Sequence, residues 1–94
     1  MSKDSAIFKL LTDWSAYGIG AVLLQLQEGV LRLICAIGRK CTSAESRYSS
    51  IKGELLAGIF AVRRLSYYLL YRPFEWHTDS SVLLYLNSLR STRL

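Results

Sequence analysis

Residues 52–70 read KGELLAGIFAVRRLSYYLL, and this stretch decides the fold class. Large apolar side chains recur in it at helical spacing, namely Leu55, Leu56, Ile59, Phe60, Val62 and Leu65. We therefore predict a long helix that buries this apolar face. Glu54 stands directly before the apolar run, and two interpretations of it are open. It is either a solvated residue that favours the positive end of the helix dipole or a carboxylate kept for a function.

The segments around this helix have the composition of strands. Residues 6–13, 19–26 and 30–37 are apolar and β-prone, and residues 73–79 alternate in polarity. Gln27, Glu28 and Gly29 predict a hairpin turn, since glycine adopts positive φ without strain. The first half of the chain is therefore expected to be an antiparallel meander of three strands.

Capping residues set the expected limits of the helices. Thr42 and Glu45 fit a capping box for a short helical turn, and Ser49 or Ser50 can cap the long helix. The long helix should end near Leu70, because Pro73 disfavours helical geometry just before it. A last helix is expected over residues 81–89, capped by Asp79 or Ser80. Gly58 is expected to allow a close approach of the long helix to the sheet.

The resulting order of elements is β-β-β-α-β-α. A strand that follows a helical crossover usually pairs in parallel, so the fourth strand should lie beside the first. We therefore predict an α+β or α/β fold with a mixed sheet in the order 3-2-1-4. The 94 residues are enough for one small domain spanning 1–94.

Composition narrows the function classes. Twelve basic and seven acidic residues give a net charge of +5, which suits a polyanion such as nucleic acid. No segment has the length of a membrane span or the apolar core of a signal peptide, so we expect an intracellular protein, cytoplasmic or nuclear, without a membrane partner. Cys35 and Cys41 match no metal or redox spacing and are expected to be free thiols.

Three carboxylates are predicted to meet at one edge of the sheet. Asp13 and Asp79 fall near the ends of two strands expected to be parallel neighbours, and Glu54 falls in the first turn of the crossing helix. Carboxylates this close repel one another unless a cation lies between them, and oxygen ligands favour Mg²⁺ or Mn²⁺. Each residue also has a simpler interpretation: Asp13 can stabilise a turn, Asp79 can cap the last helix, and Glu54 can favour the helix dipole.

These residues resemble the ribonuclease H domain of reverse transcriptases from gypsy-type LTR retrotransposons and related retroelements. The resemblance covers nearly all of residues 7–89. The matching motifs, in chain order, are Asp13-Trp14-Ser15, Gly18 to Leu23, Gly38-Arg39-Lys40, Ala44-Glu45 with Tyr48-Ser49, Glu54 to Ala57, and Thr78-Asp79-Ser80.

The resemblance implies that Asp13, Glu54 and Asp79 are catalytic carboxylates that bind Mg²⁺ or Mn²⁺. It further implies two-metal hydrolysis of the RNA strand of an RNA–DNA hybrid, within a parent reverse transcriptase whose polymerase domains are partners. The positions of substrate contacts are expected to include Arg39, Tyr48 and Ser50.

The sequence departs from the family pattern at several points. Trp14 replaces a small residue beside Asp13, Gly38 replaces serine, and Ser80 replaces histidine. The family domain continues with a fifth strand and a final helix that bring a fourth acidic ligand, and residues 90–94 supply none. The resemblance thus implies a C-terminally short domain that binds one ion well at most and cleaves weakly or not at all alone.

Three functions therefore remain open. The chain can be a metal-dependent nuclease, an impaired relative that acts as a nucleic-acid-binding, protein-binding or assembly module, or an unrelated basic interaction domain. The open edge of the fourth strand and the apolar last helix predict a homodimer through one of them. The alternative is that the last helix folds back over that strand.

Overall fold

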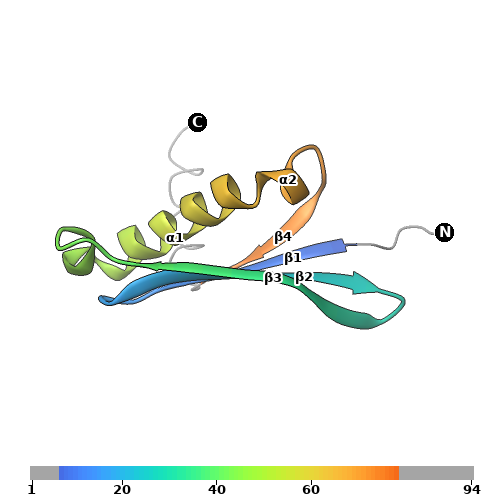
Figure 1. Cartoon of the computed structure of the whole chain (residues 1–94), viewed down its shortest axis with the longest axis horizontal. Helices are drawn as coiled ribbons and strands as arrows, with labels where there is room; N and C mark the ends of the chain where they lie inside the picture. The colour runs from blue at the N-terminus through green and yellow to red at the C-terminus, as the bar shows by residue number, and fades with distance from the viewer. Residues whose placement is uncertain (1–6, 79–94) are drawn as a thin grey trace, which may run out of the picture.

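A four-stranded sheet with one long helix across one face forms the part of the chain that the computed structural model describes, residues 7–78 (Figure 1). The strands are β1 (Ile7–Trp14), β2 (Gly18–Gln27), β3 (Val30–Lys40) and β4 (Phe74–His77). The order β3-β2-β1-β4 confirms the predicted topology. β2 pairs antiparallel with both β1 and β3, whereas β4 pairs parallel with β1. The predicted last helix lies outside the described residues.

Local sequence explains the connections. The turn between β2 and β3 places both Glu28 and Gly29 at positive φ, 53° and 78°, the pattern of a tight hairpin turn whose twist matches the strands. The predicted capping box is present before the short 3-10 helix η1 (Glu45–Arg47). In it, the Thr42 backbone N–H donates to Glu45 Oε1 at 2.9 Å, and the Glu45 N–H donates to Thr42 Oγ1 at 3.1 Å.

The long helix is shorter than predicted. It comprises α1 (Ser50–Arg64), followed by the single turn α2 (Ser66–Leu69). Ser49 is the N-cap, and its hydroxyl accepts a hydrogen bond from the backbone N–H of Lys52 at 3.2 Å. Leu65 separates the two helices, because its φ of −105° and ψ of 18° leave the helical region. The expectation of one continuous helix to Leu70 was therefore wrong.

The expected apolar face of α1 was partly wrong. The buried residues of α1 are small apart from Glu54, and they are Gly53, Glu54, Ala57, Gly58 and Ala61. Of the residues predicted for the buried face, Ile59 and Val62 are 55% and 41% exposed. Leu65 is buried as predicted, and the remaining three are half-buried, namely Leu55, Leu56 and Phe60. The size of the side chains determines which face of α1 is buried, because a stripe of glycine and alanine lets the helix approach the large side chains of the sheet.

Two tryptophan rings occupy the space that this stripe leaves. A methyl group added to Gly58 would lie 2.6 Å from Cζ2 of Trp76, and one added to Gly53 would lie 2.5 Å from Cγ of Trp14. Real Cβ atoms essentially never come within 3.0 Å of such atoms. The close approach predicted at Gly58 is confirmed, and it is repeated at Gly53.

The core lies between α1 and one face of the sheet. Its buried residues come from β1, β2, the two helices and the residue between these helices, and they are Phe8, Leu10, Ala21, Leu23, Ala61, Leu65 and Leu69. α1 and α2 lie on the same side of the sheet (Figure 1). Within residues 7–78, no helix has the length and apolar character needed to cross a membrane.

Candidate metal centre

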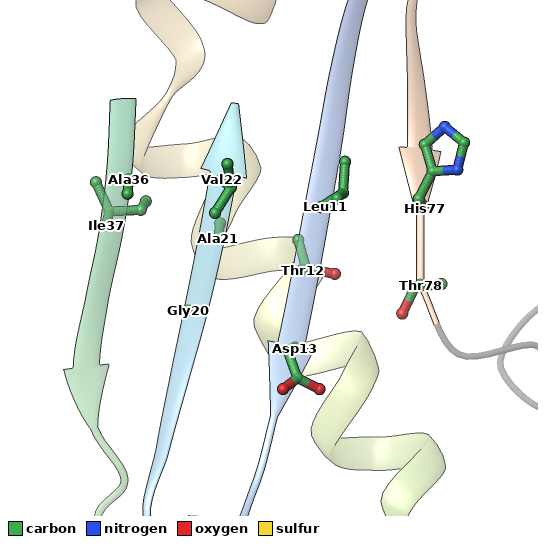
Figure 2. A pocket seen from close by; sticks show the side chains of 10 residues that line it. All are labelled: Leu11, Thr12, Asp13, Gly20, Ala21, Val22, Ala36, Ile37, His77 and Thr78. Atoms are coloured by element: carbon green, nitrogen blue, oxygen red, sulfur yellow. The ribbon is translucent and has the colours of Figure 1, made fainter. Parts of the chain in front are cut away.

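Asp13 is the last residue but one of β1 and is exposed. It pairs with Gly20 on β2, whose missing side chain leaves the carboxylate uncrowded on that side. Side chains alternate along a strand, so Asp13 and Leu11 lie on the face opposite the buried Leu10. Figure 2 shows Asp13 on β1 beside the end of β4, with α1 behind the sheet.

Glu54 lies on the buried stripe of α1, and its exposed fraction is 6%. It is the fifth residue of the helix and therefore belongs to the second turn, not to the first turn that the sequence suggested. A carboxylate that only favoured the helix dipole would lie at the surface. The interpretation of Glu54 as a solvated residue is therefore wrong.

A direct contact between β1 and α1 joins the surroundings of these two carboxylates. Trp14 follows Asp13, and its ring lies against Gly53, the residue before Glu54. The neighbouring position on β2 is filled by the buried Ile19, which pairs with Trp14. Asp13 and Glu54 are thus each one residue away from the same packing contact, one on the strand and one on the helix.

The third predicted ligand, Asp79, lies outside the described residues. The parallel register between β1 and β4 ends at the pair Leu11–His77, two residues before Asp13 on one strand and two before Asp79 on the other. Within residues 7–78, no three His, Cys, Asp or Glu side chains gather closely enough to hold a metal ion. The two described carboxylates supply oxygen donors, the ligand chemistry that suits Mg²⁺ or Mn²⁺.

An open hollow of about 560 Å³ lies on the sheet face that bears Asp13 (Figure 2). Its lining is mostly apolar and comes from all four strands and Thr78, namely Leu11, Thr12, Asp13, Gly20, Ala21, Val22, Ala36, Ile37, His77 and Thr78. The hydroxyl oxygen of Thr78 is buried there and has no hydrogen-bond partner among the described residues. The polar side chains that line the hollow are thus the carboxylate of Asp13, the imidazole of His77 and the hydroxyls of Thr12 and Thr78.

Arg39 is held by interactions within the chain. Its guanidinium donates to both carboxylate oxygens of Glu45, at 2.8 and 3.1 Å, and to the carbonyl of Lys40 at 3.0 Å. The hydrogen bond to Glu45 raises the pKa of Arg39, and the same pair lowers the pKa of Glu45 to about 2. Arg39 therefore braces the loop before α1, and any contact of its side chain with substrate stays a prediction.

Tyr48 and Ser50 flank the N-terminus of α1. The ammonium of Lys52 lies 4.4 Å from the centroid of the Tyr48 ring, which places a cation and an aromatic face together. Ser50 is the exposed first residue of the helix. Both positions can be reached from solvent, and their role as substrate contacts stays a prediction.

Of the other metal-ligating side chains of residues 7–78, His77 lines the same hollow as Asp13, but no three such side chains form a cluster. Cys35 and Cys41 are free thiols, as predicted. His77 Nε2 lies 3.1 Å from Glu75 Oε1, and the ammonium of Lys9 donates to the same oxygen at 2.6 Å. Lys9, and then His77, lower the pKa of Glu75. This polar cluster ties β4 to β1 on the face opposite α1.

Sequence reasoning missed the contact between Trp14 and Gly53. The sequence does contain residues that indicate close packing, namely two glycines inside the helix and one tryptophan in each of the strands β1 and β4. Which ring meets which glycine depends on the register between strand and helix, and single residues do not reveal it.

Comparisons with known proteins identify the family of this chain. Residues 3–94 match the model of the RNase H-like domain found in reverse transcriptase. The chain is 42% identical over 62 residues, 66% of its length, to the retrovirus-related Pol polyprotein from transposon opus of Drosophila melanogaster. It is 37% identical over 83 residues, 88% of its length, to the corresponding polyprotein from transposon 297 of the same organism. The matched parts are 6% and 8% of these relatives' lengths.

One similar solved structure is the Aquifex aeolicus member of the Ppx/GppA protein family. It is 14% identical, with a TM-score of 0.49, over 92% of this chain and 32% of that one. A similarity of this size supports no argument about fold or function.

Proposed function

Because this chain belongs to the RNase H-like domains found in reverse transcriptase, we propose that it contributes a metal-dependent nuclease site that cleaves the RNA strand of RNA–DNA hybrids. The observation that carries the proposal is the burial of Glu54 on α1, next to the contact that joins the helix to the residue after Asp13. A small fold buries a carboxylate only where a cation or hydrogen bonds offset the lost hydration.

The residues that would hold Mg²⁺ or Mn²⁺ are Asp13, Glu54 and Asp79. Asp79 follows His77, the last paired residue of β4, by two positions in the sequence, as Asp13 follows its partner Leu11, and the family resemblance supports Asp79 as the third ligand. When bound, such ions stabilise the charge that develops on the phosphate and make an attacking water more acidic. The carboxylates of the chain orient the ions, and an amide at any of these positions would keep the shape but lose the charge.

The rest of the chain is suited to a polyanionic substrate. Once the charges of Asp13, Glu54 and Asp79 are neutralised by cations, four acids face twelve bases, a formal charge of +8. Lys52, stacked on Tyr48, and the exposed Ser50 lie at the N-terminus of the helix that bears Glu54. A backbone phosphate placed there would meet a cation, a hydroxyl and the positive end of the helix dipole.

A cleavage assay with a labelled RNA–DNA hybrid and Mn²⁺ tests the proposal. We expect Glu54→Gln and Asp13→Asn to abolish whatever cleavage the chain supports and to weaken Mn²⁺ binding in calorimetric titration. Glu28→Gln is the matched control, because it removes an equal charge at the exposed hairpin turn. Cleavage that survives Glu54→Gln, or equal Mn²⁺ binding by the wild type and Asp13→Asn, would contradict the proposed site.

A second candidate function, as an assembly module for other domains of a parent polyprotein, is supported by the sheet face opposite α1. Strand pairing places an apolar set on that face, interrupted on β1 by Lys9, namely Ile7, Leu11, Val22, Leu24, Leu26, Leu31, Leu33 and Ala36. Leu31 and Leu33 are 51% and 65% exposed. Exposed apolar surface of this extent is typical of contact sites for protein partners. Cleavage of the hybrid by the chain would favour the nuclease function over this one.

A further inference from the structure

The side chain of Trp14 contacts Gly53, so it joins the residue after Asp13 to the residue before Glu54, and these are the two described carboxylates of the proposed metal site. The nearest ring atoms to a methyl group added at Gly53 are Cδ2, Cγ and Cε2, the last at 2.6 Å. These three atoms belong to the part of the indole nearest the backbone of β1. The ring therefore lies between the end of β1 and the end of the first turn of α1, one residue before Glu54.

From this contact we infer that Trp14 is a positioning residue for the metal site, an inference that rests on the proposed function. The thickness of the indole ring sets the distance between the backbone that carries Asp13 and the backbone that carries Glu54. A thinner side chain would let the helix end move toward the strand. An additional methyl group at Gly53 would push the two apart. Either change would move one carboxylate relative to the other, although neither removes a ligand.

The indole N–H of Trp14 makes no hydrogen bond within residues 7–78, so the role of this residue depends on the packing of its ring. Nε1 of Trp14 is buried and has no hydrogen-bond partner among the described residues. A buried donor without an acceptor destabilises a fold, so this group is a poor choice for a purely structural role. Trp76 differs in this respect, because its Nε1 donates to Thr12 Oγ1 at 2.9 Å. Phenylalanine at position 14 would keep ring atoms at the Cγ and Cδ2 positions and remove the unpaired donor.

Mn²⁺ affinity and folding stability, measured on the same variants of the full chain, separate positioning from packing. We expect Trp14→Ala and Gly53→Ala each to weaken Mn²⁺ binding about tenfold or more, the effect typical of residues that orient metal ligands. Trp14→Phe should bind within roughly threefold of the wild type by the same reasoning. In the double variant W14A/G53A the added methyl group meets no ring, so stability should exceed the additive expectation while Mn²⁺ affinity stays low.

A spectroscopic measurement locates the ion independently of any cleavage. With 5-fluorotryptophan at both tryptophans, Mn²⁺ should broaden the ¹⁹F signal of Trp14 more than that of Trp76, and Asp13→Asn should remove the difference. Absence of Mn²⁺ binding to the wild-type chain would overturn the metal site and this role with it. Mn²⁺ affinity that is unchanged in Trp14→Ala, or that recovers in the double variant together with stability, would overturn the positioning role alone.

Discussion

Substitution of Gly58 by alanine tests the close packing of α1 on the sheet. Alanine is the better helix former, by roughly 0.8–1.0 kcal/mol in a helix interior, so the change alone should stabilise the protein. The added methyl group, however, would lie 2.6, 3.1 and 3.2 Å from Cζ2, Cη2 and Cε2 of Trp76. The ring cannot move away freely, because its Nε1 donates to Thr12 Oγ1 at 2.9 Å.

Overpacking of this kind costs roughly 1–3 kcal/mol, which exceeds the gain in helix propensity. We therefore expect Gly58→Ala to lower the free energy of unfolding by about 1 kcal/mol, and Tm by about 4–8 °C for a domain of this size. Phenylalanine at position 76 lacks the outer ring atoms that collide. In the Trp76→Phe background, Gly58→Ala should therefore stabilise the protein by up to about 1 kcal/mol.

Urea denaturation followed by circular dichroism measures all four chains of this cycle. The control is that the effect of Gly58→Ala on the free energy of unfolding changes sign between the two backgrounds, since the gain in helix propensity is the same in both. If Gly58→Ala is as stable as the wild type with Trp76 in place, the helix does not pack on the ring as described.

Three further predictions concern the loop, the helix cap and the sheet edge. The pKa of Glu45 is lowered from 4.5 to about 2, mainly by the hydrogen bond from Arg39, so the stability it contributes is present above pH 4.5 and is lost as the pH falls toward 2. The urea midpoint of Glu45→Gln should therefore fall less between pH 6 and pH 3 than that of the wild type, and equal falls would contradict this. Ser49→Ala removes the N-cap of α1 and should cost about 1 kcal/mol in thermal unfolding, whereas Ser50→Ala, which leaves the cap intact, should cost less. Sedimentation equilibrium should show a dimer, because β4 is an edge strand of the sheet formed by residues 7–78; a monomer at high concentration would contradict dimerisation through that edge.

The strands and their order could be predicted from the sequence because local signals and topology agree. The hairpin glycine, the capping box and the alternation in the fourth strand are all short-range features, and the parallel pairing of β4 with β1 follows from the helical crossover. The observed strand boundaries differ most from the predicted ones at β3, which continues to Lys40, and at β4, which spans only four residues. The ends of these strands are determined by pairing with a partner strand, and the sequence of a single segment carries little information about that pairing.

The orientation of α1 could not be predicted from hydrophobicity. The pattern places the largest apolar side chains on one face, but the face that enters the core carries Ala57, Gly58 and Ala61. Trp14 and Trp76 already fill the space above the sheet, so only a helix face without large side chains fits against them. Glu54 lies on that same face, and this is why its burial could not be recognised from its position before the apolar run.

The two tryptophan–glycine contacts act together on the position of Glu54. Gly53 and Gly58 are five residues apart, which is about 7.5 Å along the helix axis. A helix held at two such points is restricted in tilt as well as in height, and Glu54 lies between the points, one residue from the first. A methyl group at Gly53 should therefore displace Glu54 more than one at Gly58. Calorimetric titration with Mn²⁺ should show a larger loss of affinity for Gly53→Ala than for Gly58→Ala, whatever their order in stability, and the opposite order of affinities would show that the contact at Trp14 does not position the carboxylate.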